Sequence, residues 1–131
     1  TDRREISADL FFTDMFETAL DEGELITEIS FPIPEVCGYV KFPNPATRYA
    51  LVGVMVAKFG NTIRVAVTGA GPCVFRVAEM EQALMAHFAP DSIKDGMVSA
   101  DDLNNDIHAS REYRAHLVGV IARRAVAEAN G

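Results

Sequence analysis

The residues with the greatest potential for chemistry lie in one short segment, between Tyr39 and Tyr49. A proline-stiffened loop, Pro43-Asn44-Pro45, lies in the middle of this segment and cannot be helical. Around this loop the segment carries Tyr39, Lys41, Asn44, Thr47, Arg48 and Tyr49. Together they could present an aromatic face, an ammonium and hydrogen-bonding groups to a flat anionic ligand. An ordinary strand-loop-strand anchored by tyrosines is the alternative, and the residue types alone favour it.

The same segment lies in a region of the chain without acidic residues. Residues 36–76 hold five Lys or Arg residues and no Asp or Glu, whereas residues 1–35 hold ten carboxylates against two arginines. On a chain of net charge −7, such a region can attract a bound anion or an acidic patch of a partner protein. Five charges scattered over the surface of strands are the plainer interpretation. The acidic balance of the whole chain excludes a general affinity for nucleic acid.

Other motifs that could do chemistry are weaker. Thr68-Gly-Ala-Gly-Pro72 resembles the start of a dinucleotide-binding loop, but the third glycine would fall at Val74 and Pro72 has no N–H for a phosphate. A turn that leads into a helix is the better interpretation. The histidines match no metal-binding spacing, and no Ser-His-Asp or Cys-His set is visible. We expect structural or solvent-facing roles for His87, His108 and His116.

Hydrophobic periodicity predicts the elements that must position these residues. Two β-rich runs on either side of Gly60-Asn61 indicate a hairpin, and Tyr113 is expected to be a buried anchor of the last helix. Predicted strands cover residues 25–31, 38–42, 49–59 and 62–67, and predicted helices cover residues 76–88, a short stretch near 100–105, and 110–130. Strands first and helices afterwards predict an α+β fold, in which an antiparallel sheet of three or four strands packs against about three helices as a two-layer sandwich.

Length and composition are those of one globular domain, covering residues 1–131. No apolar run reaches the roughly 20 residues of a membrane-spanning helix, so membrane insertion is not expected. The chain starts without a signal-peptide core. It also starts without an initiator Met, which indicates either an excised piece of a longer chain or a trimmed chain. Cys37 and Cys73 match no metal-site spacing and are expected to be small buried thiols of a cytoplasmic protein.

A longer series of residues resembles a known family. The series is Phe11-Phe12-x-x-x-Phe16-x-Thr18-Ala-Leu20-x-x-Gly23-Glu24-Leu25-Ile26-Thr27-Glu28-Ile29-x-Phe31-Pro32, then Gly38-Tyr39-x-Lys41, Tyr49-Ala50, and Asp106-x-His-Ala-Ser110-x-Glu112-Tyr113-Arg114 with Arg123-Arg124-Ala125-Val126. In order and spacing it resembles the C-terminal domain of the FAD-binding medium subunit in the aerobic carbon monoxide dehydrogenase and xanthine dehydrogenase family, over roughly residues 8–128.

The resemblance implies an α+β sandwich and a role in electron relay. In that family a large subunit with a molybdenum cofactor oxidises or hydroxylates substrate, and a small subunit passes the electrons through two 2Fe–2S clusters. The FAD of the medium subunit then delivers them to an acceptor. The glycine-rich FAD-binding loops of the family belong to two more N-terminal lobes and do not occur in this sequence. The chain is therefore expected to be the third lobe of an oxidoreductase subunit, with FAD as the cofactor of the complete subunit.

The matched residues also imply a site. Lys41 stands where the family's lysine lies close to the flavin, and Tyr49 stands where an aromatic ring covers one face of the isoalloxazine. An ammonium at the N1–C2=O edge would help to stabilise negative charge on the flavin, and a stacked ring would restrict access from that side. The implied cofactor-binding set is Tyr39, Lys41, Asn44, Arg48 and Tyr49. Arg48 and the proline-rich loop depart from some relatives, and both would affect the flavin's surroundings.

Two other classes of function remain open. A cofactor-free interaction or scaffold domain would carry Lys41 and Tyr49 as ordinary residues of a sheet surface. A stand-alone small-molecule enzyme has less support, because the sequence contains no visible acid-base or nucleophile set.

Overall fold

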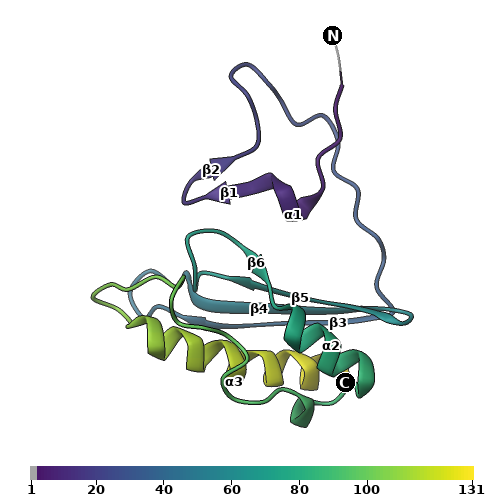
Figure 1. Ribbon diagram of the computed structural model, residues 1–131, viewed down its shortest axis with the longest axis vertical. Coiled ribbons are helices and arrows are strands. Elements are labelled where there is room, and N and C mark those ends of the chain that lie inside the picture. The colour runs from purple at the N-terminus through teal and green to yellow at the C-terminus, as the bar shows by residue number, and fades with distance from the viewer. Residues whose placement is uncertain (1–2) are drawn as a thin grey trace.

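The computed structural model describes residues 3–131, which form an N-terminal arm and a body of sheet and helices (Figure 1). The arm, residues 3–35, contains the one-turn helix α1 (Ala8–Phe11) and a two-stranded sheet of β1 (Phe12–Asp14) and β2 (Glu17–Thr18). The body contains β3 (Val36–Pro43), β4 (Ala50–Phe59), β5 (Thr62–Thr68), β6 (Phe75–Arg76), α2 (Ala78–Ala86), the 3-10 helix η1 (Pro90–Ser92) and α3 (Arg111–Ala129). The predicted α+β class is confirmed.

The body is built on a four-stranded antiparallel sheet in which the strands follow chain order, β3-β4-β5-β6. β4 and β5 stay in register from Gly53 opposite Thr68 to Phe59 opposite Thr62. The tight turn between them uses Gly60 at φ 58°, a left-handed conformation that glycine adopts without a Cβ clash. The hairpin predicted at this position is confirmed.

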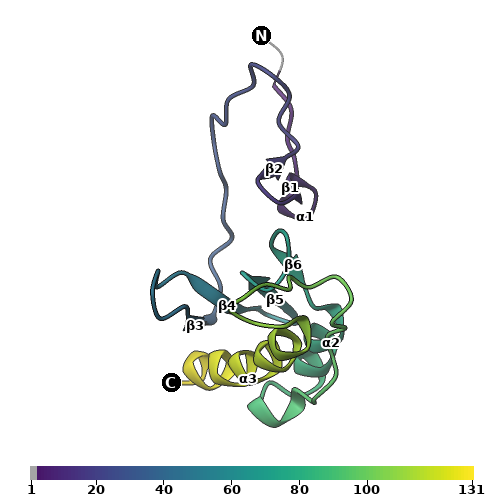
Figure 2. The same cartoon turned by 90° about the vertical axis from the view of Figure 1, so that its left-hand side faces the viewer.

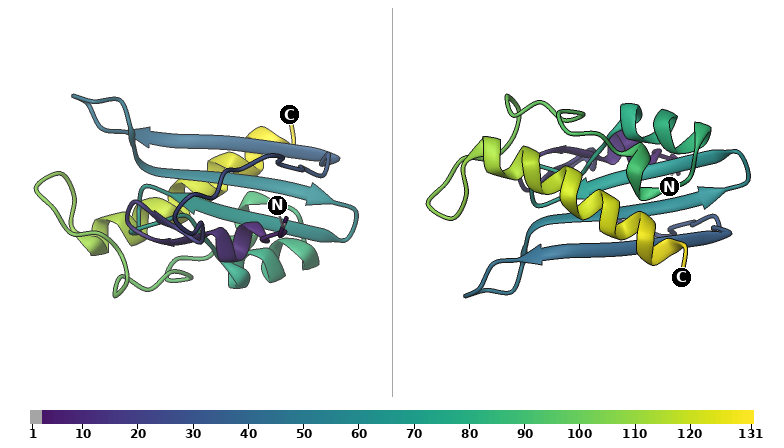
Figure 3. Two further views of the ribbon diagram at one scale, coloured as in Figure 1. Left: turned by 90° about the horizontal axis from the view of Figure 1, so that it is seen from above. Right: turned by 90° about the horizontal axis from the view of Figure 1, so that it is seen from below.

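Helices α2 and α3 cover one face of this sheet, as Figures 2 and 3 show. α3 runs across β3 and β4, and α2 packs against β5. Alternate residues of a strand point to the same face, so the valines of β4 and β5 meet the apolar sides of the two helices. The buried core includes Val52, Val54, Val56, Val65, Val67, Met80, Leu84, Leu117, Val118, Ile121 and Val126.

The backbone of α3 lies close to β3. A Cβ built on Gly38 would come within 2.2 Å of the Ala125 carbonyl oxygen and 2.8 Å of the Ala129 nitrogen. Real Cβ atoms do not approach backbone so closely, and only glycine permits this crossing of helix over strand. The right-hand view of Figure 3 shows α3 along this part of the sheet.

The opposite face of the sheet carries the residues that the sequence singled out. Tyr39 and Lys41 alternate along β3 with the helix-facing Gly38 and Val40, and their register partners in β4 are Met55 and Gly53. A Cβ on Gly53 would lie 2.6 Å from the Tyr39 hydroxyl, so the Tyr39 side chain lies across this glycine. We call this surface the open face. The arm lies on the same side of the sheet (Figure 1).

The strand predicted over residues 25–31 is wrong. The structure describes no regular element in residues 24–34, and Leu25 and Phe31 are 85% and 81% exposed. A strand forms only beside another strand that takes up its N–H and C=O groups. Within residues 3–131 no strand pairs with this segment. Pro32 and Pro34, which follow it in the chain, lack the backbone N–H groups that a strand ladder needs.

Three smaller predictions also need correction. Tyr113 is 44% exposed, because it stands in the first turn of α3 at the rim of the core, with its ring edge-on to Phe42. Cys37 is exposed and Cys73 is half-buried, since strand alternation puts Cys37 on the open face. Residues 100–105 form turns rather than a helix, while η1 provides a short helix earlier in the chain.

Within residues 3–131, no helix combines the length and apolar character needed to cross a membrane.

Candidate functional site

The hairpin between β3 and β4 contains all five residues of the expected cofactor-binding set. Its loop, residues 44–49, is closed by two backbone hydrogen bonds. The Asn44 N–H donates to the Tyr49 carbonyl at 2.8 Å, and the Arg48 N–H donates to the Asn44 carbonyl at 2.9 Å. Pro43 and Pro45 fix φ on either side of Asn44. The loop therefore has one defined shape.

Asn44 organises this loop from within. Its side chain is buried, and its Oδ1 accepts from the N–H groups of Ala46 at 2.9 Å and Thr47 at 3.3 Å. Asparagine favours turns of this kind because its side chain substitutes for a backbone acceptor. The contact of Asn44 with a cofactor stays a prediction, and the structure assigns this residue to the shape of the loop.

Lys41 and Arg48 meet at the end of the hairpin. The Lys41 ammonium donates to the Arg48 carbonyl at 3.1 Å. An ammonium has three donors, so this contact leaves two N–H groups for other acceptors. Arg48 has φ 64°, a left-handed conformation that is uncommon for a residue other than glycine. Hydrogen bonds at both its N–H and its carbonyl hold Arg48 in this conformation.

Tyr49 extends from the same end of the hairpin and is 79% exposed. A tyrosine ring with so much free surface can stack against a flat ligand. Tyr39 is half as exposed, because its ring lies against the sheet. The structure thus joins Lys41 to the backbone carbonyl of Arg48, the residue before Tyr49. It places Tyr39 with Lys41 on the open face and turns Asn44 inward.

The chemistry of these groups fits the cofactor that the resemblance implies. Lys41 offers N–H donors with a positive charge, Tyr49 offers an exposed ring, and residues 36–76 contain no carboxylate that would repel an anionic ring system. Hydrogen bonds from a charged donor to such an acceptor are stronger than neutral ones. In type and position the residues could hold the ring system of a flavin.

A buried arginine beneath the hairpin was missed by the sequence reasoning. Arg114, in the first turn of α3, is 3% exposed. Its Nη1 donates to the Leu51 carbonyl at 2.8 Å and to the Gly69 carbonyl at 3.0 Å, and its Nη2 donates to Asp106 at 2.8 Å. Asp106 and Arg114 both occur in the series of residues that resembles the known family, but the resemblance assigned no role to either of them.

Asp106 holds the loop in front of α3 and pairs with Arg114. One of its carboxylate oxygens accepts from the N–H groups of His108 at 2.9 Å and Ala109 at 3.1 Å. The hydrogen bond from His108, with those from Ala109 and Arg114, keeps the pKa of Asp106 below its ordinary value, although some desolvation opposes this. Asp106 therefore stays ionised as the counter-charge of the buried guanidinium.

A second buried charge lies at the other end of the sheet. Glu81 in α2 accepts from the Val65 N–H at 3.0 Å and from Arg76 at 2.8 Å and 2.5 Å, and Arg76 also contacts Asp9 of the arm at 2.7 Å. Burial alone would raise the pKa of Glu81, but the hydrogen bonds from Arg76 and Val65 and the nearby arginine charges outweigh it and lower the pKa. The group links α2 to β5 and to the arm.

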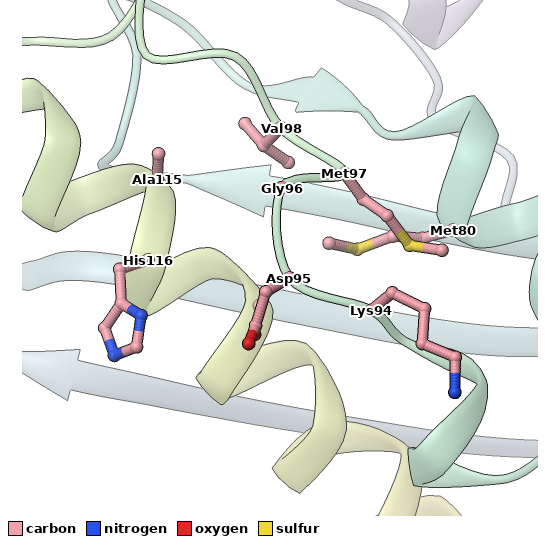
Figure 4. Close-up of a pocket in the computed structure, with 9 residues that line it drawn as sticks. Met80, Lys94, Asp95, Gly96, Met97, Val98, Ala115 and His116 are labelled. Atoms are coloured by element: carbon pink, nitrogen blue, oxygen red, sulfur yellow. The ribbon is translucent and has the colours of Figure 1, made fainter.

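Two cavities in the described part of the chain lie away from the hairpin. One, of about 200 Å³, lies between α3 and the loop of residues 94–98, with Met80, Met97 and His116 in its lining (Figure 4). The other, of about 430 Å³, lies near Cys73 and Arg76. The residues that line them include none of the expected cofactor-binding set. The candidate site is therefore an exposed surface that would need a second surface to enclose a ligand.

Comparison with known proteins finds similar sequences and similar solved structures. The chain is 33% identical to the medium subunit of nicotine 6-hydroxylase from Paenarthrobacter nicotinovorans, over 97% of the chain and 48% of that subunit. It is 27% identical to the carbon monoxide dehydrogenase medium chain of Hydrogenophaga pseudoflava, over 95% of the chain and 47% of the relative. Reconstituted carbon monoxide dehydrogenase from Oligotropha carboxidovorans matches with a TM-score of 0.81 at 23% identity, over 96% of this chain and 48% of that one. No protein-family model matches.

The fold is thus one that solved carbon monoxide dehydrogenases also contain. The chain is related in sequence to the medium subunits of nicotine 6-hydroxylase and carbon monoxide dehydrogenase. It spans about half the length of the curated relatives that it matches. The resemblance to the C-terminal domain of this FAD-subunit family, expected from the sequence, is confirmed.

Proposed function

We propose that this chain is the C-terminal lobe of an FAD-binding medium subunit in a molybdenum hydroxylase of the carbon monoxide dehydrogenase type, where it forms part of the flavin pocket wall. The observation that carries the proposal is the end of the hairpin, where the Lys41 ammonium binds the Arg48 carbonyl and the next residue, Tyr49, has an exposed ring, within a stretch of sequence (residues 36–76) that contains no carboxylate. Sequence similarity to the medium subunits of nicotine 6-hydroxylase and carbon monoxide dehydrogenase supports it. In this proposal residues 1–131 act as one lobe of a longer flavoprotein.

The bound FAD would supply the redox chemistry, receiving electrons from iron–sulfur clusters and passing them to an acceptor. Lys41 donates hydrogen bonds to the pyrimidine edge of the ring system, and its positive charge favours negative charge at that edge. Tyr49 covers one ring face and keeps water and small solutes from it. The Arg48 carbonyl holds the Lys41 ammonium in place for this contact.

The arm supports a role in assembly. Phe16, Leu25, Phe31 and Ile33 are each more than four-fifths exposed, and so many large apolar side chains in the open on one arm suit contact with another protein surface. We assign it to contacts within the longer subunit and with its partners, a large subunit with the molybdenum cofactor and a small subunit with 2Fe–2S clusters. The assembled oxidoreductase would act in the cytoplasm.

The proposal is tested by titrating the medium subunit that carries this chain with FAD and following flavin fluorescence. Lys41→Met and Tyr49→Ala should each weaken FAD binding by about tenfold, which corresponds to about 1.4 kcal/mol. Lys41→Met should also lower the flavin midpoint potential by about 30 mV, because a positive charge that favours the two-electron reduced state is removed. Tyr49→Phe keeps the ring and should bind FAD as the wild type does.

Lys58→Met is the matched control for the loss of a lysine charge. Lys58 belongs to the same sheet, but its ammonium lies 5.6 Å from the Phe88 ring centre, and its place in the alternation of β4 is on the helix-covered face. This variant should leave FAD affinity and potential unchanged. If Lys41→Met and Tyr49→Ala behave like it, the flavin role is wrong, and a cofactor-free interaction domain becomes the better description.

A further inference from the structure

The Arg114 guanidinium connects three separate parts of the chain beneath the candidate site. It reaches the start of β4 through the Leu51 carbonyl, the end of β5 through the Gly69 carbonyl, and the loop before α3 through Asp106. These acceptors are distant in sequence from Arg114, by 63 residues for Leu51 and 45 for Gly69. Arg114 therefore ties α3 and the loop before it to the paired ends of β4 and β5, just beyond the last pair of their ladder, Gly53 with Thr68.

The Leu51 carbonyl needs a hydrogen-bond donor from elsewhere because Leu51 has no paired residue in β3. Phe42 pairs with Val52, but the next pair is Pro43 with Ala50, so Leu51 is the extra residue of a β-bulge. A bulge leaves ladder groups without their usual partners, and here the Leu51 carbonyl accepts from Arg114 instead. Leu51 follows Tyr49 by two residues, so the guanidinium holds the backbone that directs the Tyr49 ring.

Gly69 brings the second carbonyl within reach. It adopts φ 79°, and a Cβ at this position would come within 2.3 Å of the Ala50 carbonyl oxygen. Only glycine can adopt this backbone so close to β4. The close approach places the Gly69 and Leu51 carbonyls where a single Nη1 atom donates to both. This explains the Thr68-Gly-Ala-Gly-Pro72 turn by its packing.

A planar guanidinium suits this position, and an ammonium does not. Arginine presents its donors in a rigid fork and stays charged when buried. Arg114 needs two of its nitrogens to reach acceptors in different directions, with Asp106 on one side and the two carbonyls on the other. Lysine offers one compact charged group and could not span them.

We propose that Arg114 and Asp106 are a positioning pair that sets the Tyr49 end of the β3–β4 hairpin for its contact with the flavin. The inference rests on the proposed function, since it gives that contact a support. Neither residue touches the cofactor in this proposal. Arg114 acts through the Leu51 carbonyl, and Asp106 acts through Arg114.

The experiment uses the medium subunit that carries this chain, with the variants Arg114→Lys, Arg114→Met and Asp106→Asn. Arg123→Met is the matched control, because Arg123 also joins α3 to a carbonyl and a carboxylate, those of Ile93 and Asp95, but away from the hairpin. Amide hydrogen exchange of residues 44–52 is measured without FAD, and FAD affinity is measured separately.

The Arg114 variants should speed exchange in residues 44–52 by about tenfold or more and weaken FAD binding by at least about tenfold. Asp106→Asn keeps the shape of the side chain. It should also speed exchange and weaken FAD binding, each by a smaller factor than the Arg114 variants do. Arg123→Met should leave both unchanged, whatever it does to the melting temperature. If Arg114→Met does not fold, Arg114→Lys and Asp106→Asn still decide the result.

Exchange and FAD affinity within twofold of the wild type in the folded Arg114 and Asp106 variants would overturn the positioning role. Tyr49→Ala, measured in parallel, separates this from failure of the proposed function. If Tyr49→Ala leaves FAD binding unchanged, the flavin contact itself is wrong, while hydrogen exchange still reports whether the pair orders the hairpin.

Discussion

At the scale of single residues, the buried carboxylate of Glu81 is the clearest case of a charge that must be compensated. Glu81 is 5% exposed, and an isolated ion at such a position is strongly unfavourable. Two hydrogen bonds from Arg76 and one from the Val65 N–H replace the lost water. The arginine is therefore required by the glutamate, and the two residues are expected to act as one unit in stability measurements.

Glu81→Gln should lower the free energy of unfolding by about 1–3 kcal/mol at pH 7, because a charged hydrogen-bond acceptor is lost from a buried position. The pKa of Glu81 is lowered in the folded state, so its contribution is present above its ordinary pKa of 4.5 and is lost as the pH falls through the lower folded value. Urea unfolding of wild type and variant at pH 7 and at a series of pH values below 4.5 should show the difference shrinking.

Glu79→Gln serves as the control for this pH series, since Glu79 is an exposed residue of the same helical turn. It should change stability little at any pH. A difference between wild type and Glu81→Gln that stays constant down to the lowest pH would contradict the lowered pKa.

The sequence predicted which residues of a strand share a face better than it predicted which polar residues are buried. Strand alternation places Tyr39 and Lys41 on one face, and no distant contact is needed to know this. Arg114 could not be recognised as buried, because its acceptors on β4 and β5 come together only in the folded chain. The prediction that Tyr113 is buried was wrong for a related reason. The point at which β3 ends determines how far the core extends along α3.

At the scale of elements, the placement of α3 depends on one glycine in β3 and tolerates a side chain at one glycine of its own. Gly38 faces the Ala125 carbonyl at a distance that excludes a Cβ, whereas a Cβ on Gly119 would meet only the Arg123 side chain, at 3.9 Å. The first glycine is required by packing. The second lowers the helical stability of α3 without an evident steric reason.

Gly38→Ala should therefore destabilise the protein by about 1–3 kcal/mol, because the extra methyl group pushes α3 from the sheet. Gly119→Ala should stabilise it by about 0.5–1 kcal/mol, because alanine loses less backbone entropy in a helix. Urea unfolding at one pH measures both. Equal effects of the same sign would contradict the close packing of α3 on β3.

Elements with strong local signals were predicted correctly, and those that depend on neighbours were not. The β4–β5 hairpin turns at Gly60, whose left-handed φ of 58° is specified by the local Gly60-Asn61 sequence. The 25–31 segment has strand-like alternation, but neither edge strand of the body's sheet, β3 or β6, pairs with it. Hydrophobic periodicity predicts which face of a strand is apolar, but it does not predict whether a neighbouring strand is present to pair with it.

At the scale of the whole molecule, charge and apolar surface are unevenly distributed. The helices cover one face of the sheet, and the arm lies on the other side (Figures 1 and 2), which is also the side of Tyr39 and Lys41 in the alternation of β3. The strands carry no carboxylate between residues 36 and 76, while the arm carries most of its apolar side chains in the open. Both features fit the proposed lobe, in which this face of the sheet and the arm would contact other parts of a larger flavoprotein.

The most direct test of the account is a crystal structure of the FAD-loaded medium subunit that carries this chain. The account predicts that Lys41 Nζ lies about 3 Å from the N1–C2=O edge of the flavin and that the Tyr49 ring stacks on the isoalloxazine at about 3.5–4 Å. A flavin bound with both side chains farther than about 6 Å away, beyond hydrogen-bond and cation–π reach, would contradict it.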